Sequence, residues 1–185
     1  NKLAEVNIPA TTQLTTINDY SFAECAILPS FTMPNTVTTI GAGAFYSCPL
    51  LKTVTLSNKL ATIPNETFRK CSLLNNVTIP RSVSSLGTNS FRECTSLSSI
   101  VIPNSVTAMG TSVFEDCTGL TVASIEDGST LDNLPDWTFY NTRITSFTIP
   151  ASVQTINHGV FMKCSALTSI VIPNTVKNFA NTEIF

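Results

Sequence analysis

Six cysteines recur at matching positions along the chain, and thiols can form disulfides, bind zinc or act as nucleophiles. Each cysteine stands three residues after a phenylalanine, as Cys94 does after Phe91. An even number of cysteines in a short secreted chain would suggest disulfides. Here we expect one inward-facing column, in which parallel side chains do not aim their sulfurs at one another. We therefore predict free, buried thiols that pack as small hydrophobic groups. The cysteines are Cys25, Cys48, Cys71, Cys94, Cys117 and Cys164.

Other groups capable of chemistry are sparse. Zinc sites commonly contain a C-x-x-C pair, which the sequence lacks, and the single histidine, His158, lies outside the cysteine column. We expect His158 to be solvated in a turn. Burial raises the pKa of a thiol and makes it inert, and no glycine-rich phosphate loop occurs. We therefore expect no catalysis, no cofactor and no metal.

The phenylalanines indicate the architecture that positions these groups. One recurs every 23 residues as far as Phe114, and then after 25 and 22 residues. A period of roughly 20 to 29 residues is typical of a leucine-rich solenoid, whose units bury their apolar side by stacking on their neighbours. Thr142 replaces the cysteine in one unit. The phenylalanines are Phe22, Phe45, Phe68, Phe91, Phe114, Phe139 and Phe161.

One complete unit begins at Leu97 with the pattern L-x-x-I-x-I. The last two apolar residues of this pattern point to the same face of an extended strand. Pro103 ends the strand because it has no amide hydrogen to donate. Further on, Phe114 and Cys117 have the i, i+3 spacing of a short helical turn. We predict a mainly β solenoid with short helical turns, about eight coils of about 23 residues, and a parallel sheet on the concave face.

Composition restricts the possible partners. The chain has 185 residues, of which 43% are hydrophobic and 12% charged, with a net charge of −2. Binding to nucleic acid or to an anionic membrane needs clustered Lys and Arg, which are absent from the sequence. No stretch approaches the roughly 20 apolar residues of a membrane span, so we expect no membrane insertion by this segment. Roughly a quarter of the residues are Ser or Thr, which predicts a polar but nearly uncharged surface.

The unit from Leu97 to Cys117, L-x-x-I-x-I-P-x-x-V-x-x-I-G-x-x-x-F-x-x-C, resembles the BspA-like class of leucine-rich repeats over nearly the whole chain. Ser105 stands where commoner leucine-rich repeats place Asn or Cys, which favours this class. Members are often surface proteins of bacteria and protozoa, implicated in adhesion to host matrix proteins and to other cells. The resemblance thus implies a protein-binding module at the cell surface or secreted. The resemblance assigns no catalytic or ligand-binding residue to this chain.

Two rows of side chains point outward from the predicted sheet, and most are Thr or Ser. Threonine suits an exposed strand whether or not the strand binds a partner. The rows contain none of the Trp, Tyr and Arg residues that dominate interface hot spots, so both interpretations remain open. The candidate partner-binding residues in these rows are Thr32, Thr55, Thr78, Ser99, Val101, Ser124 and Thr148.

The coil after Cys117 is irregular and provides a second candidate site. Residues 126–130 replace the usual proline turn and lengthen it by two residues. The acids and aromatics of this coil suggest a partner site, with Trp137 partly buried beside Phe139. An acidic loop can also hold calcium, but the spacing does not match D-x-[DN]-x-[DN]-G. The candidate residues here are Asp127, Asp136, Trp137 and Tyr140.

Two non-enzymatic functions remain open. The resemblance favours an extracellular adhesion module, whereas free thiols and an uncharged surface favour a cytoplasmic scaffold within a larger assembly. We expect residues 1–185 to form one domain that belongs to a longer chain or stacks end to end with another protein, because neither end carries a polar cap. Asn65 and Asn76 begin Asn-x-Thr sequons, and a glycan on Asn76 would obstruct the sheet.

Overall fold

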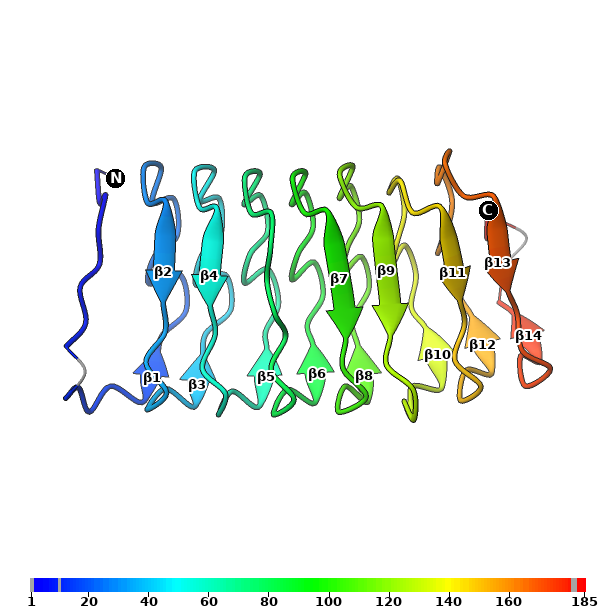
Figure 1. Cartoon of the computed structure of the whole chain (residues 1–185), viewed down its shortest axis with the longest axis horizontal. Coiled ribbons are helices and arrows are strands. Elements are labelled where there is room, and N and C mark those ends of the chain that lie inside the picture. The colour runs from blue at the N-terminus through cyan, green and yellow to red at the C-terminus, as the bar shows by residue number, and fades with distance from the viewer. Residues whose placement is uncertain (1, 10, 181–182) are drawn as a thin grey trace.

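The computed structural model describes residues 2–9, 11–180 and 183–185 and shows a solenoid of about seven turns (Figure 1). Each turn advances by about 23 residues, which confirms the predicted period. The expected number of coils was about one too high. Residues 2–9 repeat the apolar spacing of the strand pattern at Leu3, Val6 and Ile8, and they run alongside the next coil but form no strand.

The predicted parallel sheet is present and is built from one short strand in most coils. Its members pair in parallel with a step of one repeat, so that Thr32 lies opposite Thr55 and Ser146 opposite Ser169. An isolated bridge between Thr53 and Asn76 continues the sheet across the coil that lacks a strand there. The strands are β2 (Ser30–Thr32), β4 (Thr53–Thr55), β7 (Ser99–Ile102), β9 (Val122–Ile125), β11 (Ser146–Thr148) and β13 (Ser169–Val171).

A second series of parallel strands, not predicted from the sequence, follows the proline turns along one edge of the solenoid (Figure 1). Each is two residues long, which is too short to give a recognisable alternation of apolar and polar residues. The strands are β1 (Thr16–Ile17), β3 (Thr39–Ile40), β5 (Thr62–Ile63), β6 (Ser85–Leu86), β8 (Ala108–Met109), β10 (Asn133–Leu134), β12 (Thr155–Ile156) and β14 (Asn178–Phe179).

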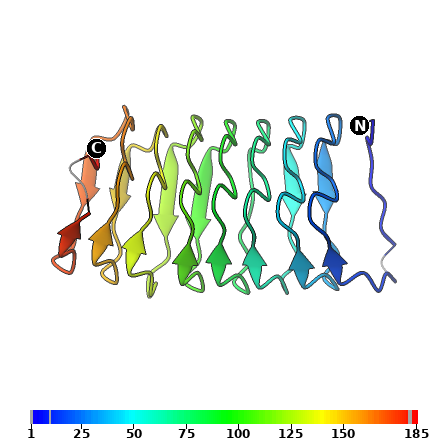
Figure 2. The same ribbon diagram turned by 180° about the vertical axis from the view of Figure 1, so that it is seen from behind.

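The third side of each coil is a turn segment that runs up the back of the solenoid (Figure 2). The sequence predicted short helical turns here, but no helix is assigned in the described residues. The residues two before and two after each phenylalanine have positive φ, for example 57° at Asn89 and 63° at Glu93, which breaks a helix. We call the outer surface of these segments the turn face. It comprises residues 20–24, 43–47, 66–70, 89–93, 112–116, 137–141 and 159–163.

The amide groups of the turn segments bond to the next coil instead of forming a helix. The N–H of Phe91 donates to the carbonyl oxygen of Val113 at 3.0 Å, and the N–H of Glu93 donates to that of Glu115 at 2.9 Å. Equivalent bonds link every neighbouring pair of described turn segments. These bonds satisfy the backbone groups that a helix would otherwise have paired internally.

The phenylalanines form a continuous stack through the core, as the period predicted. Ring centroids in successive coils are 5.2 Å apart for Phe22 and Phe45, and 5.8 Å apart for Phe139 and Phe161. The planes are nearly parallel, with 13° between Phe91 and Phe114. The stack excludes water from the centre of each coil, and its offset rings pack favourably.

The cysteines form the predicted inward column, and Cys48, Cys71, Cys94, Cys117 and Cys164 are free thiols. They pack in the hydrophobic core as predicted, and their thiols also form hydrogen bonds. The Sγ of Cys71 donates to the carbonyl oxygen of Phe45 at 3.1 Å, and the Sγ of Cys94 donates to that of Phe68 at 3.1 Å. The column therefore connects coils by hydrogen bonds as well as by packing.

The described part of the chain contains no helix that could span a lipid bilayer.

Candidate partner-binding surfaces

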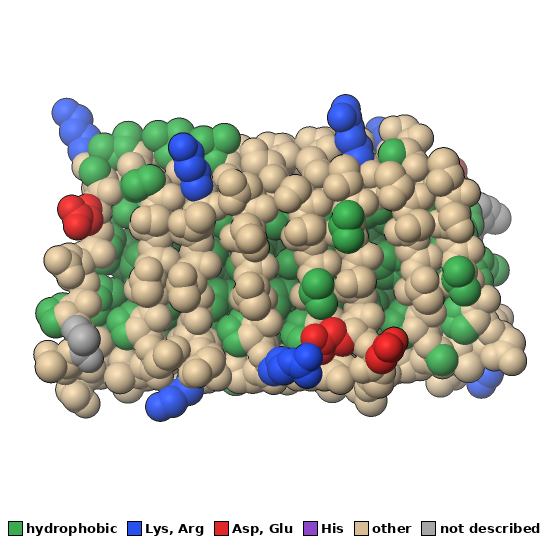
Figure 3. Space-filling view, viewed as in Figure 1, with side chains coloured by type: hydrophobic (Ala, Val, Ile, Leu, Met, Phe, Trp, Pro, Cys, Tyr) green, Lys and Arg blue, Asp and Glu red, His purple; other side chains and the backbone are tan. Residues whose placement is uncertain are grey.

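The outward side of the strand series β2 to β13, here called the sheet face, carries the first group of predicted site residues (Figure 3). Strand burial alternates along this series, as in Ser99–Ile102, where the first and third residues are exposed and the second and fourth are buried. The pleat therefore orients alternate side chains to solvent. The residues placed together on this face are Thr32, Thr55, Thr78, Ser99, Val101, Ser124 and Thr148.

Two valines interrupt the Ser and Thr side chains near the middle of the sheet face. Val101 on β7 is 53% exposed and Val122 on the neighbouring β9 is 59% exposed. The register pairs Ser99 with Val122 and Val101 with Ser124, so the valines lie diagonally across the strand pair. Diagonal neighbours in a sheet are close enough for their side chains to form one surface. The valines thus give the sheet face an aliphatic centre.

An ion pair borders this centre. The Nη2 of Arg81 lies 2.7 Å from the Oε1 of Glu126, and the Oε2 of Glu126 accepts the N–H of Asn104 at 3.2 Å. The Arg81 side chain is 71% exposed, whereas that of Glu126 is 25% exposed. Both oxygens of Glu126 are therefore engaged, while most of the guanidinium group faces solvent. The ion pair holds the Arg81 side chain in place, and the remaining N–H donors of its guanidinium group can bind a partner.

Two hollows flank this ion pair, and Glu126 lines both. One, of about 440 Å³, is lined by Arg81 and Val101 among others. The other, of about 520 Å³, lies under the lengthened turn and is lined by Asp127 and Thr148 among others. The lengthened turn closes around Gly128, whose φ of 77° disfavours other residues. The insertion of residues 126–130 therefore shapes the sheet face locally and places Asp127 beside it.

The remaining predicted site residues lie elsewhere. Asp136, Trp137 and Tyr140 belong to the turn segment that follows β10, so the acids and aromatics of the irregular coil do not form one cluster. The Oδ1 of Asp136 accepts the N–H of His158 at 3.0 Å. The Nζ of Lys163 lies 5.0 Å from the ring centroid of Tyr140, within the range of a cation–π contact.

Trp137 packs on the following coil. Its ring meets that of His158 edge-on at 5.6 Å and covers Gly159, where a Cβ atom would lie 2.5 Å from the indole Cδ1. The indole is still 37% exposed. Both Trp137 and Gly159 have positive φ, at 53° and 63°. A glycine is thus required beneath the ring for steric as well as conformational reasons.

The expectation that His158 is solvated was wrong. Its side chain is 26% exposed, and its Nε2 lies 4.0 Å from the Oε2 of Glu183. Its Nδ1 is buried and has no hydrogen-bond partner among the described residues. Trp137 covers the ring from one side, which the sequence spacing did not indicate.

The turn face holds the aromatic residue types that the sheet face lacks, together with two arginines. All three tyrosines and the single tryptophan of the chain belong to it, and so do Arg69 and Arg92. Trp, Tyr and Arg are enriched in interface hot spots. This concentration escaped the sequence analysis, although it follows from reading the positions two before and one after each phenylalanine. The aromatic residues are Tyr20, Tyr46, Trp137 and Tyr140.

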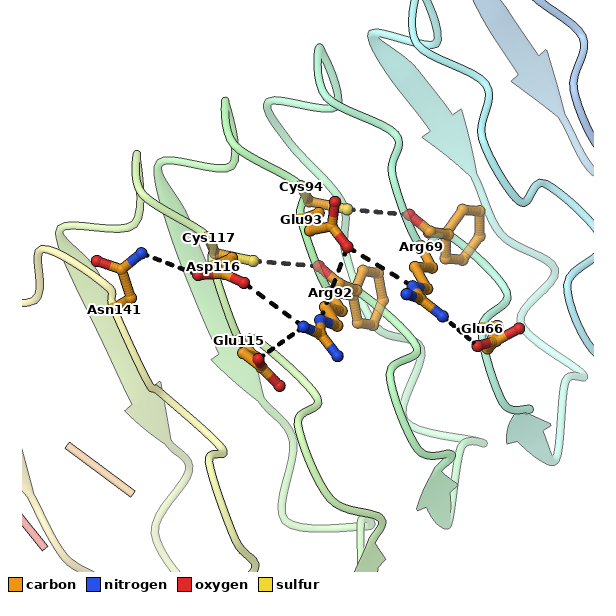
Figure 4. Close-up of polar contacts among 11 residues, drawn as sticks. Glu66, Arg69, Arg92, Glu93, Cys94, Glu115, Asp116, Cys117 and Asn141 are labelled. Atoms are coloured by element: carbon orange, nitrogen blue, oxygen red, sulfur yellow. Dashed lines mark hydrogen bonds and ion pairs between the residues drawn. The ribbon is translucent and has the colours of Figure 1, made fainter. Parts of the chain in front are cut away.

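A ladder of ion pairs crosses the turn face (Figure 4). The Nη1 of Arg69 lies 2.6 Å from the Oε1 of Glu66 in its own coil, and its Nε lies 3.7 Å from the Oε1 of Glu93 in the next. The Nη2 of Arg92 lies 2.8 Å from the Oε1 of Glu115. Because each arginine reaches into a neighbouring coil, the ladder connects the coils electrostatically on the outside, as the thiols connect them inside.

Asp116 extends the ladder. Its Oδ2 lies 3.8 Å from the Nη2 of Arg92, and its Oδ1 accepts a hydrogen bond from the Nδ2 of Asn141 at 2.8 Å. Charged side chains make up only 12% of the chain, so their concentration in these adjacent coils is a local feature of the turn face.

The cysteines and the acidic side chains are the groups that could take part in thiol or metal chemistry. No group of three or more His, Cys, Asp or Glu side chains within the described residues is placed to hold a metal ion. Burial raises the pKa of the Cys94 and Cys117 thiols well above its usual range. A thiol in this state is a weak nucleophile.

The two sequons differ in their accessibility. Asn76 is exposed on the sheet face, next to Thr53. The Oδ1 of Asn65 instead accepts the N–H of Thr88 at 2.9 Å, and Thr67 of the same sequon is fully buried, with its Oγ1 donating to the Pro64 carbonyl oxygen. In the folded chain Asn76 is therefore the more accessible acceptor.

Several solved structures share this fold. A leucine-rich repeat protein from Bacteroides ovatus is 26% identical, with a TM-score of 0.86, over 92% of this chain and 46% of its own. The T. pallidum leucine-rich repeat protein is also 26% identical, with a TM-score of 0.70, over 94% of this chain and 72% of its own. A leucine-rich repeat protein from Eubacterium ventriosum shares the fold. It is 20% identical, with a TM-score of 0.63, over 88% of this chain and 53% of its own. The chain thus spans about half the length of the B. ovatus protein.

Among curated proteins no match is found. The model of the BspA-type leucine-rich repeat region matches residues 1–121 and 96–184 with six copies. These matches cover nearly the whole chain and agree with the repeated phenylalanine and cysteine columns. The chain belongs to the BspA-type leucine-rich repeat family.

Proposed function

We propose that this protein is a non-enzymatic protein–protein interaction module that binds its partner through the sheet face. The observation that carries the proposal is the pair of exposed valines, Val101 and Val122, beside the Arg81–Glu126 ion pair. An aliphatic centre with a polar rim is the usual anatomy of a protein interface. The surrounding Ser and Thr hydroxyls supply donors and acceptors in a fixed register.

The chemistry of the face indicates what the partner presents. Val101 and Val122 provide apolar area for an aliphatic or aromatic side chain, and the hollow beside Arg81 is large enough to take one. The free donors of Arg81 suit a carboxylate at the rim of that contact. We infer a partner surface with an apolar residue next to an acidic one.

The module acts at the cell surface or after secretion, as an adhesion module for host matrix or neighbouring cells. Membership of the BspA-type family supports this location. The alternative is a scaffold role inside the cell. It is favoured by the free thiols of Cys48, Cys71, Cys94, Cys117 and Cys164, because disulfides form in oxidising compartments. Antibody staining of cells with and without permeabilisation separates the two: staining of intact cells supports the surface location, and staining only after permeabilisation supports the scaffold.

Binding itself is tested by biolayer interferometry against immobilised collagen, laminin and fibronectin. We expect the native chain to bind at least one of them and the Val101→Asp/Val122→Asp variant to bind at least tenfold more weakly. Val171→Asp is the matched control because Val171 is 55% exposed on the same strand series but does not line either hollow. Equal losses in both variants, or no binding by the native chain, would count against the proposal.

A further inference from the structure

The charges on the turn face follow a definite order along the solenoid. From the N-terminal side, Tyr46 is followed by Glu66, Arg69 and Lys70, then by Arg92 and Glu93, then by Glu115 and Asp116, and finally by Tyr140. Figure 4 shows the middle of this order, from Glu66 to Asp116. The coil of Phe68 therefore carries a net charge of +1 on this strip, because Glu66 offsets one of its two basic side chains. The coil of Phe91 is neutral, the coil of Phe114 carries −2, and a tyrosine lies at each end. We call residues 46–140 of the turn face the charged strip.

We propose that the charged strip is a self-complementary interface through which two copies of this chain pair back to back in antiparallel orientation. A two-fold axis through the coil of Phe91 would place the coil of Phe68 opposite that of Phe114. Lys70 of each copy would then face Asp116 of the other, and Tyr46 would face Tyr140. An interface of this kind is isologous, since the same patch is used on both sides.

A parallel arrangement of the two copies does not fit the same surface. It would set Arg69 and Lys70 against their own equivalents and Glu115 against Glu115. Like charges brought together at an interface oppose association, so the order of charges selects the antiparallel pair.

The side chains of the strip are already held in place before association. Arg69 is fixed by Glu66 at 2.6 Å and Arg92 by Glu115 at 2.8 Å, and their side chains are 24% and 29% exposed. Little rotamer entropy is lost when such groups meet a partner. Lys70 packs its ammonium group 6.0 Å from the ring centroid of Tyr46 and is therefore partly oriented as well.

The size of the strip sets the strength of the pair. At roughly 4.8 Å per coil, the span from Tyr46 to Tyr140 is on the order of 20 Å. A strip of this length that is only one turn segment wide covers less than the area of about 800 Å² per partner that stable complexes bury. The dimer is thus a weak one, with a dissociation constant in the micromolar range or above, and the sheet face of each copy stays free for its own partner.

Reversing one charge at a time tests the interface. Lys70 and Asp116 have φ of 64° and 60°, and the same row holds Glu93 at 63° and Lys163 at 62°, so both charge types are compatible with this backbone. We expect sedimentation equilibrium of the native chain to show a monomer–dimer equilibrium. Lys70→Glu or Asp116→Lys alone should weaken the dimer at least tenfold, because like charges then meet twice across the axis.

Mixing the two variants gives the decisive result. Glu at 70 in one copy would face Lys at 116 in the other, so the mixture should dimerise at least tenfold more tightly than either variant alone. Lys52→Glu is the matched control, since Lys52 is exposed beside β4 on the other side of the coil, and it should leave the dimer unchanged. Circular dichroism checks that each variant is folded.

Three outcomes would overturn the proposal. The first is a native chain that stays monomeric up to about 1 mM, well above the range expected for such an interface. The second is a dimer that neither Lys70→Glu nor Asp116→Lys weakens, which would assign self-association to another surface. The third is a mixture of the two variants that stays monomeric, which would exclude the antiparallel arrangement.

Discussion

The thiol of Cys117 donates a hydrogen bond to the carbonyl oxygen of Phe91, in the preceding coil, at 3.1 Å. The same contact joins Cys164 to Phe139 at 3.0 Å. Thr142, which replaces a cysteine, donates instead to Phe139 of its own coil at 2.9 Å. A cysteine suits this position because it is small and apolar enough for the core yet still provides a donor that reaches the neighbouring coil.

The buried thiols predict a loss of stability at alkaline pH. Burial raises the pKa of Cys94 and Cys117 above the ordinary value of 9.0. The unfolded chain therefore releases these protons above pH 9 while the folded chain retains them, so their contribution to stability is fully present below pH 9 and declines above it. We expect a decline of about 1.4 kcal/mol per pH unit for each such thiol.

Urea unfolding at pH 7.5, 9 and 10 under a reducing agent measures this slope. Cys94→Thr is the matched variant, because Thr142 shows that the position accepts threonine. Above pH 9, the free energy of unfolding of the variant should decline by about 1.4 kcal/mol less per pH unit than that of the native chain, because one buried thiol has been removed. An identical slope in the native chain and the variant would contradict the assignment.

The phenylalanine stack predicts a large effect of Phe91→Ala. Phe91 is fully buried, with Phe68 and Phe114 stacked at 5.3 and 5.5 Å. Removing the ring opens a cavity between two packed coils, so the free energy of unfolding should fall by about 3 to 5 kcal/mol. Chemical denaturation measures the change.

The control for this variant is Thr55→Ala. Thr55 is exposed on β4, so its replacement should change stability by no more than about 0.5 kcal/mol. A loss below about 1 kcal/mol for Phe91→Ala would show that the ring does not support the core.

Gly159→Ala should displace Trp137. The new Cβ would lie 2.5 Å from the indole Cδ1, and φ of 63° strains alanine as well. Because Trp137 is the single tryptophan of the chain, its fluorescence reports the displacement directly. We expect a red-shifted emission maximum and a loss of about 1 to 3 kcal/mol.

Gly128→Ala separates the two causes. Gly128 also has positive φ, at 77°, but the nearest atom to a new Cβ would be 3.6 Å away. This variant should therefore lose about 1 kcal/mol from backbone strain and keep the native emission maximum. A shift of the same size in both variants would refute the packing of Trp137 on Gly159.

The ion-pair ladder predicts a salt-dependent loss in Arg92→Met. The substitution removes the 2.8 Å contact to Glu115 and the longer ones to Glu93 and Asp116. We expect a loss of about 1 to 2 kcal/mol at low salt. The loss should shrink in 1 M NaCl, where repulsion between the remaining carboxylates is screened.

Arg81→Met is the comparison, because Arg81 is 71% exposed and, among the residues that the structure describes, forms an ion pair only with Glu126. Its loss should stay below about 1 kcal/mol. Thermal unfolding monitored by circular dichroism at both salt concentrations measures the two variants side by side. Equal losses would mean that the ladder adds nothing beyond a single exposed pair.

The core and the sheet of this protein could be predicted from the sequence because their signals are periodic. The recurring spacing of Phe91 and its equivalents sets the stack, and the alternation around Ile100 and Ile102 sets the strand. Such patterns reflect which side chains are buried together in the core. They therefore survive local irregularities such as the insertion at residues 126–130.

The turn segments could not be predicted in the same way. The i, i+3 spacing of Phe114 and Cys117 matches a helix, but Ser112 and Asp116 have φ of 58° and 60°. Left-handed conformations are unfavourable for such residues in isolation, by about 1 to 2 kcal/mol each. Hydrogen bonds to the next coil compensate for this, and a single repeat gives no indication of them. The sequence correctly predicted that the sheet-face residues lie on one surface. It did not predict that Trp137 and Tyr140 lie on the turn face, away from Asp127, because that separation depends on the conformation of the turn segments.

The backbone hydrogen bonds that join neighbouring turn segments all run one way. The N–H groups of Phe22, Phe45 and Phe68 each point to the following coil, and their carbonyl acceptors lie at Ala44, Thr67 and Ser90. The peptide dipoles on this side of the solenoid therefore add up, as they do along an α-helix, with the positive end toward the C-terminus. Any further coil or second protein that continues the stack can match donors to acceptors only head to tail.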